Sequence, residues 1–130
     1  MTEFAVATSN KSQFIDITGE VQRAVTAAGV KDGLCTVFVP HTTAGITIQE
    51  NADPDVVADI LYALDKDVPW RDSHYRHAEG NTAAHVKASL LGSSVNVLVK
   101  SGRLHLGTWQ AIYFCEFDGP RTRQVWVTVS

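Results

Sequence analysis

Four of the five histidines of this chain lie in two short stretches. His74, His77 and His85 fall within twelve residues, and His41 opens a stretch of small and hydroxyl-bearing residues that runs to Gly45. Imidazole is the side chain best suited to move protons or bind a metal ion near neutral pH. Three histidines from two elements (His41, His77 and His85) would give an open divalent-metal site with a free position for water or substrate. Their spacing is not that of a zinc-protease helix, which weakens the metal interpretation. The alternative is that they are surface or hydrogen-bonded residues.

Glu116 is an acidic residue on the apolar side of an expected strand. In a strand expected over residues 108–117, it shares one side with Ile112 and Phe114. An acid on an otherwise apolar side lies either at the wet rim of a sheet, the simpler explanation, or in a site. Glu50 and Asn51, which follow another expected strand, belong to the same second layer of polar candidates.

Anion-binding groups follow Glu116 and precede His85. Arg121 and Arg123 could clamp a phosphate, since guanidinium groups bind it with two parallel hydrogen bonds, or they could merely pair with Asp118 and solvent. Asn81 begins an expected helix, and the free amides and dipole of a helix start attract anions. His85 lies four residues further on, and so on the same face of that helix.

The elements that position these residues follow from apolar periodicity and caps. Helices are expected over residues 18–28, capped by Thr18 and ended at Gly29, over 54–66 after the start signal Asp53–Pro54, and from Asn81 or Thr82 to Gly92. Strands are expected over 4–6, 14–17, 34–39, 45–50, 95–100, 108–117 and 124–129. Strands dominate both ends and three helices interrupt them, which predicts an α+β fold with a mainly antiparallel sheet. Strand alternation places His41 on a polar surface.

Length and composition set the class of protein. The 130 residues, with 45% hydrophobic and 19% charged side chains, predict a single globular domain over 1–130. The formal net charge of −3 argues against non-specific nucleic-acid binding. No apolar run reaches membrane-spanning length and no leader pattern opens the chain, so we expect a cytoplasmic protein with no membrane partner. Cys35 and Cys115 lie in apolar runs and are expected to be buried free thiols.

Four segments carry a resemblance to a known family. They cover nearly the whole chain in the same order, and the Gly-Thr-Trp-Gln element at 107–110 is highly specific. The segments are 41–51, 80–85, 97–112 and 116–121. On these motifs the chain resembles the YjbQ family, also described as secondary thiamine-phosphate synthases.

The resemblance implies a function and a site. It implies a homotrimer of compact α+β sandwiches that joins a hydroxymethylpyrimidine diphosphate to a thiazole phosphate with release of pyrophosphate, as a weak side activity. The pocket would be lined by histidines, around a divalent metal such as Mg²⁺ or Zn²⁺. In a trimer, His41 and His85 could come from different subunits. The implied residues are His41, His85 and Glu116 as catalytic groups; His41, His77 and His85 as metal ligands; and Glu50, Asn51, Asn81, Arg121 and Arg123 as substrate-binding groups. The alternatives are a non-catalytic trimeric metal- or anion-binding module and a metal-dependent hydrolase of a phosphorylated metabolite.

Overall fold

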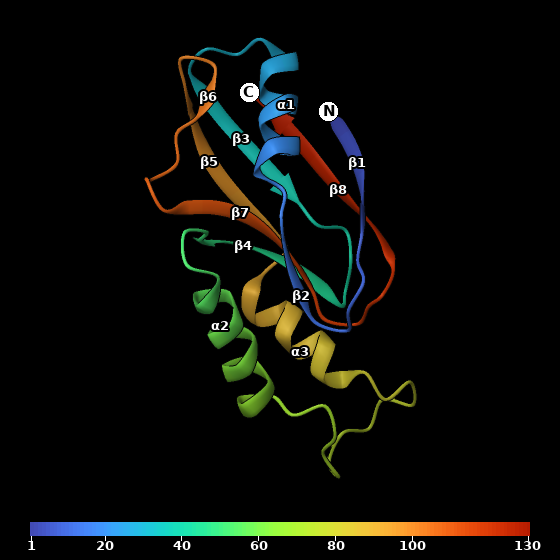
Figure 1. The fold of residues 1–130 in the computed structure, drawn as a ribbon. Coiled ribbons are helices and arrows are strands. Elements are labelled where there is room, and N and C mark those ends of the chain that lie inside the picture. The colour runs from blue at the N-terminus through green and yellow to red at the C-terminus, as the bar shows by residue number, and fades with distance from the viewer.

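The computed structural model of this chain describes residues 1–130 as eight strands and three helices (Figure 1). In chain order they are β1 (Thr2–Ala7), β2 (Gln13–Asp16), α1 (Thr18–Ala28), β3 (Gly33–Phe38), β4 (Ala44–Glu50), α2 (Pro54–Asp67), α3 (Thr82–Leu91), β5 (Ser94–Lys100), β6 (Arg103–Leu104), β7 (Gln110–Glu116) and β8 (Thr122–Val129). The predicted α+β class and the three helices are confirmed.

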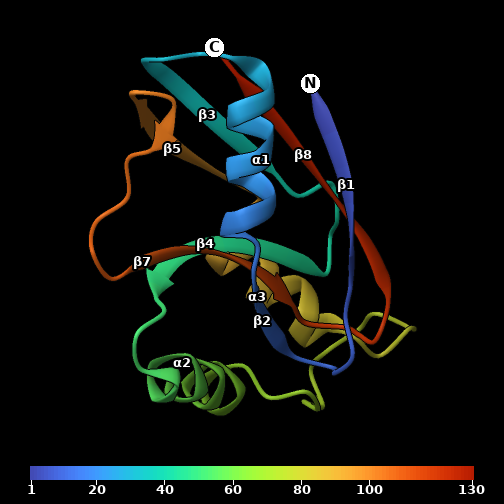
Figure 2. The same cartoon turned by 45° about the horizontal axis from the view of Figure 1, so that its top comes forward.

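The strands form two sheets instead of one. Five strands pair in the order β1-β8-β3-β5-β6 and three in the order β2-β7-β4, and every pair is antiparallel. Helix α1 and the three-stranded sheet pack on one face of the five-stranded sheet, while α2 and α3 lie on the opposite side of the three-stranded sheet (Figures 1 and 2). The other face of the five-stranded sheet carries no helix.

Two apolar clusters hold these layers together. The larger one joins α1 to the facing sides of both sheets, with Val21, Ile46 and Phe114 fully buried. The smaller one places Ala84 and Ala88 of α3 against β7. Small side chains let α3 approach closely: a Cβ on Gly45 would lie 2.7 Å from the carbonyl oxygen at the end of α3. The Gly45 side of β4 is therefore covered by a helix, so the predicted polar surface there is wrong.

The predicted ends of α3 at Asn81 and Gly92 are confirmed, as are the start of α2 and the end of α1. Asp53 accepts a hydrogen bond from the Asp55 amide at 2.9 Å with Pro54 in the first turn, and Gly29 ends α1 in a left-handed conformation with φ of 69°. Thr18 is not the cap of α1, because it is already helical. Its Oγ1 instead accepts the Ile112 amide at 2.9 Å, which ties the start of α1 to β7.

Two further sequence expectations can be compared with the structure. Cys35 and Cys115 are buried free thiols, as predicted, and burial raises the pKa of Cys35 to about 11. None of the three helices has the length and apolar character that crossing a membrane requires.

Candidate functional site

Most of the predicted polar residues meet at one cavity of about 410 Å³. The cavity lies where the loop between β3 and β4, the segment leading into α3, and the start of β8 come together. Its walls are almost entirely polar, which sets it apart from the apolar core. The lining residues are Pro40, His41, Thr42, Thr43, His77, Glu79, Asn81, His85, Arg121 and Arg123.

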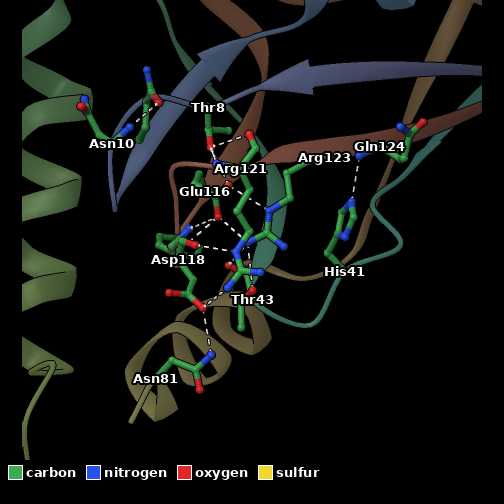
Figure 3. A network of polar contacts seen from close by, with 12 residues as sticks. Thr8, Asn10, His41, Thr43, Asn81, Glu116, Asp118, Arg121, Arg123 and Gln124 are labelled. Atoms are coloured by element: carbon green, nitrogen blue, oxygen red, sulfur yellow. Dashed lines mark hydrogen bonds and ion pairs between the residues drawn. The ribbon is translucent and has the colours of Figure 1, made fainter. Parts of the chain in front are cut away.

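A buried ion pair forms the back of this cavity (Figure 3). Arg123 is 5% exposed and Glu116 is 0% exposed. Arg123 donates from Nε to Glu116 Oε1 at 2.9 Å and from Nη2 to Oε2, and Nη2 also donates to Thr43 Oγ1 at 2.9 Å. Two hydrogen-bonded contacts between planar groups fix the guanidinium in one orientation.

Glu116 holds Arg123 and does not reach the cavity. Its Oε1 also accepts from the Thr8 hydroxyl at 2.8 Å, and its Oε2 accepts the amides of Phe117 and Asp118. Burial would raise the pKa of Glu116, but the hydrogen bonds from Arg123, the Asp118 amide and Thr8 outweigh it and hold the pKa below its ordinary value. The rim interpretation is therefore wrong. The predicted catalytic role does not fit either, because an ionised carboxylate with both oxygens engaged is a positioning group.

One nitrogen of Arg123 is left for a ligand. Its four hydrogen bonds all use Nε and Nη2. The only buried side-chain polar atoms without a partner are Asn81 Oδ1 and Thr82 Oγ1, so Nη1 must be reached by solvent. Arg123 contributes to the cavity wall, and Nη1 is its one nitrogen with no protein acceptor.

Arg121 repeats this arrangement nearer the surface. Its Nε donates to the Asp118 carbonyl at 2.8 Å and its Nη2 to Asp118 Oδ2 at 2.9 Å, while Nη1 has no protein acceptor. Asn81 donates from Nδ2 to the same Oδ2 at 2.8 Å, which ties the start of α3 to Asp118. Of the two alternatives for Arg121, pairing with Asp118 is confirmed, and this pairing still leaves a free donor.

His41 is held as a neutral imidazole. It lies in the loop before β4, where its Nε2 accepts the Gln124 amide at 2.8 Å (Figure 3). Burial, followed by the positive charge of Arg123, lowers the pKa of His41. With Nε2 acting as an acceptor, the ring proton must be on Nδ1. His41 is therefore a hydrogen-bond donor through Nδ1 and has no lone pair left for another partner.

His77 and His85 both line the cavity and pack edge to face. Their ring centroids are 5.4 Å apart and the rings are nearly perpendicular. His77 Nε2 lies 4.0 Å from a Glu79 carboxylate oxygen. His41, His77 and His85 thus share one cavity within a single chain, while exposed His74 lies outside it beside Asp72.

The three histidines do not form the predicted metal centre. Within this chain no group of three or more His, Cys, Asp or Glu side chains is arranged to hold a metal ion. The tautomer of His41 gives a physical reason, because a histidine ligand must offer an unprotonated nitrogen. Its only such nitrogen is occupied by the Gln124 amide.

Glu50 and Asn51 lie at the far end of the three-stranded sheet. Glu50 is opposite Gln110 at the start of β7, whereas Ala44 is opposite Glu116 at its end. Seven strand residues separate the two ends by about 20 Å. Asn51 instead donates its amide to the Trp109 carbonyl. Within a single chain they do not reach this cavity, and their role in substrate binding stays a prediction.

Sequence reasoning missed two threonines that complete the network. Thr8 binds Glu116 from more than 100 positions away, and nothing in the polar turn that follows β1 indicates this. Thr43 was visible within the predicted histidine stretch, but its bond to Arg123 depends on how β4 and β8 are placed in space.

Fold and site together define a small two-sheet α+β protein with a cavity lined by arginine and histidine. A sequence model of the family described as "UPF0047 protein YjbQ-like" matches residues 2–130. The chain belongs to this YjbQ-like family, as its motifs indicated.

Relatives from bacteria and archaea cover almost the same length. UPF0047 protein YugU of Bacillus subtilis is 53% identical over 122 residues, which cover 94% of this chain and 92% of that protein. A UPF0047 protein of Methanocaldococcus jannaschii is 45% identical, with coverage of 98% and 91%. The crystal structure of an uncharacterised YjbQ/UPF0047 protein from Clostridium acetobutylicum, 58% identical, matches with a TM-score of 0.98 over 100% of both chains. A conserved hypothetical protein from Thermus thermophilus, 42% identical, matches with a TM-score of 0.93 over 100% of both.

Proposed function

We propose that the cavity binds the phosphate groups of a small phosphorylated substrate. One observation carries this proposal: Arg121 and Arg123 are each fixed by an acidic partner and each keeps Nη1 free at the same cavity. Donors fixed before the ligand arrives lose little conformational entropy on binding. A tetrahedral oxyanion can accept from both at once.

Other groups around the cavity favour the same ligand. The neutral His41 contributes a donor at Nδ1, as its contact with the Gln124 amide requires. Helix α3 begins at the cavity wall, and its amide dipoles add positive potential. The acids in the network, Glu116 and Asp118, are engaged by arginines, so their charge is largely compensated.

We further propose the reaction that the family resemblance implies, the synthesis of thiamine phosphate. The thiazole ring nitrogen forms a bond to the pyrimidine methylene carbon as the bond from that carbon to the diphosphate oxygen breaks, and pyrophosphate leaves with the electron pair of the broken bond. Arg121 and Arg123 would stabilise the negative charge that grows on the leaving oxygens. His85 would protonate one of them as a general acid. Mg²⁺ would enter bound to the diphosphate, as part of the substrate.

An activity assay tests the reaction. Purified protein with both precursors and Mg²⁺ should form thiamine phosphate above background. His85→Ala should lose this activity while its unfolding curve stays that of a folded protein. His74→Ala is the matched control, because His74 lies outside the cavity, and it should keep the activity. Absence of product with the parent protein would overturn the proposed reaction.

We propose that the chain works as a homotrimer, and the uncovered sheet face supports assembly. The ring centroids of Phe38 and Trp126 lie 5.8 Å apart there, and further along β3 Leu34 lies opposite Leu98, which is 62% exposed. Exposed apolar patches of this kind favour contact with another protein surface. Light scattering should give three times the monomer mass.

A cavity formed within one chain makes a separate prediction about the assembled protein. Mixing His41→Ala with His85→Ala protein should restore no activity.

A non-catalytic anion-binding module is the second candidate. The locked tautomer of His41 and the ionised Glu116 favour it, because neither is poised to exchange a proton. Calorimetry distinguishes the two: phosphate binding without turnover of the two precursors would support the module. A metal-dependent hydrolase gains no support from this geometry, because the chain lacks a preformed set of ligands.

A further inference from the structure

A second cavity adjoins the first one. It has a volume of about 570 Å³ and lies in the long connection between α2 and α3. Three of its lining side chains are aromatic rings: Trp70, Tyr75 and His77. His77 also lines the arginine cavity, so the two spaces share a wall.

The connection at residues 68–81 has no helix or strand, but its own hydrogen bonds fix its shape. Asp72 accepts the amide of His74 at 2.8 Å through its side chain and the amide of Tyr75 at 3.1 Å through its carbonyl. The Tyr75 hydroxyl donates to the Pro69 carbonyl at 3.0 Å. Connections of this length without secondary structure are uncommon in small domains, and those that pack on themselves often carry function.

Trp70 presents a fixed and partly open aromatic surface. It packs beside the smaller apolar cluster under α3, and the Lys11 ammonium lies 4.0 Å from its ring centroid. The side chain is nevertheless only half-buried, and it lines the cavity together with half-buried Tyr75. A half-exposed ring that is held in place can stack on a flat ligand without first being ordered.

We propose that this second cavity binds the flat conjugated ring of a ligand whose phosphate lies between Arg121 and Arg123. The inference rests on the proposed phosphate site and adds a separate ring site, formed by Trp70 and Tyr75 in the connection between α2 and α3. The ring packs on Trp70 and Tyr75, and the ester linkage passes His77, the residue common to both cavities. An aliphatic phosphate ester would fill only the arginine cavity.

Three simple probes test this division. Calorimetry with inorganic phosphate, methyl phosphate and phenyl phosphate separates the anion from the ring. Stacking on a protein aromatic ring is worth about tenfold in affinity, so phenyl phosphate should bind about ten times more tightly than methyl phosphate. Trp70→Ala should remove this difference and leave methyl phosphate binding unchanged, and Trp70→Phe should keep most of it.

Each outcome separates the ring site from the phosphate site. If methyl phosphate binds and phenyl phosphate binds no more tightly, the ring site is wrong and the phosphate site stands. Equal preference for phenyl phosphate in the parent and Trp70→Ala proteins also overturns the ring site. If none of the three probes binds the parent protein, the proposed phosphate site fails, and the ring inference fails with it. Because the parent protein alone gives the phenyl-to-methyl ratio, a variant that misfolds does not prevent the test.

Discussion

The two ends of the three-stranded sheet carry similar polar residues in different environments. At one end, Glu116 of β7 is completely buried and bound by Arg123. At the other end, Glu50 of β4 is only half-buried and Asn51 is exposed. Both ends lie in segments that match the family, yet only the first has an acid that holds a residue of the arginine cavity in place. The difference shows that an acid becomes part of a site through the partners that surround it.

Loss of the Glu116 carboxylate should have the largest effect of any change at either end. Glu116→Gln leaves the Arg123 guanidinium buried without a counter-charge, which costs about 3–5 kcal/mol of unfolding free energy. Glu50→Gln at the other end should change it by less than about 0.5 kcal/mol. Urea denaturation of both variants measures the contrast, and equal losses would show that the two ends do not differ.

Shortening the arginine should have the next largest effect. Arg123→Lys keeps the charge but cannot hold both Glu116 oxygens and also present a donor to the cavity. We expect phosphate affinity to fall by about 2 kcal/mol, close to thirtyfold. Arg23→Lys is the control, because the Arg23 side chain lies on the exposed side of α1, and this variant should bind phosphate like the parent. An unchanged affinity in Arg123→Lys would remove Arg123 from the phosphate site.

A smaller effect should appear in the pH dependence of stability. The pKa of His41 lies below its ordinary value of 6.5 in the folded chain, so unfolding takes up a proton between the two values. The contribution of His41 is therefore complete above pH 6.5 and is lost as the pH falls below it. His41→Gln keeps an acceptor for the Gln124 amide without titrating, so unfolding midpoints should decline less between pH 7.5 and 5.5. A variant as pH-sensitive as the parent would refute this role, and His74→Gln serves as the control.

The smallest effect belongs to the far end of the sheet. Asn51→Ala and Glu50→Gln should each alter phosphate affinity by less than about twofold, because both residues lie about 20 Å from the cavity. Calorimetry under the conditions used for Arg123→Lys makes the comparison. A larger loss in either variant would mean that this end contributes to a site, as it would if a neighbouring subunit brought it to the cavity.

Local features of the sequence predicted the elements well and the network poorly. Asp53, Pro54 and Gly29 define helix ends through contacts within a few residues, so the sequence alone predicts these ends. The surroundings of Glu116 depend on Thr8, which lies 108 positions away, and on how the strands are arranged. The sequence showed that Glu116 lies on the apolar side of its strand. Only the fold shows that it forms a buried ion pair and does not lie at a solvent-exposed sheet edge.

The histidines illustrate the same limit. The family resemblance implied that His41, His77 and His85 would line one pocket, and all three line the same cavity. The sequence could not predict which ring nitrogen of each histidine carries the proton. The backbone amide of Gln124, 83 positions away, decides which nitrogen of His41 carries the proton. This contact is one reason why the single chain has no preformed set of metal ligands at the cavity.

The buried position of Glu116 and Arg123 has a consequence for how such a protein can change over generations. A substitution at either residue is selected against through misfolding, whatever molecule the cavity binds. The connection at residues 68–81 lies mostly at the surface, so its side chains can vary without that penalty. The buried pair behind the arginine cavity is thus kept together with the fold, while the side chains of the connection remain free to change.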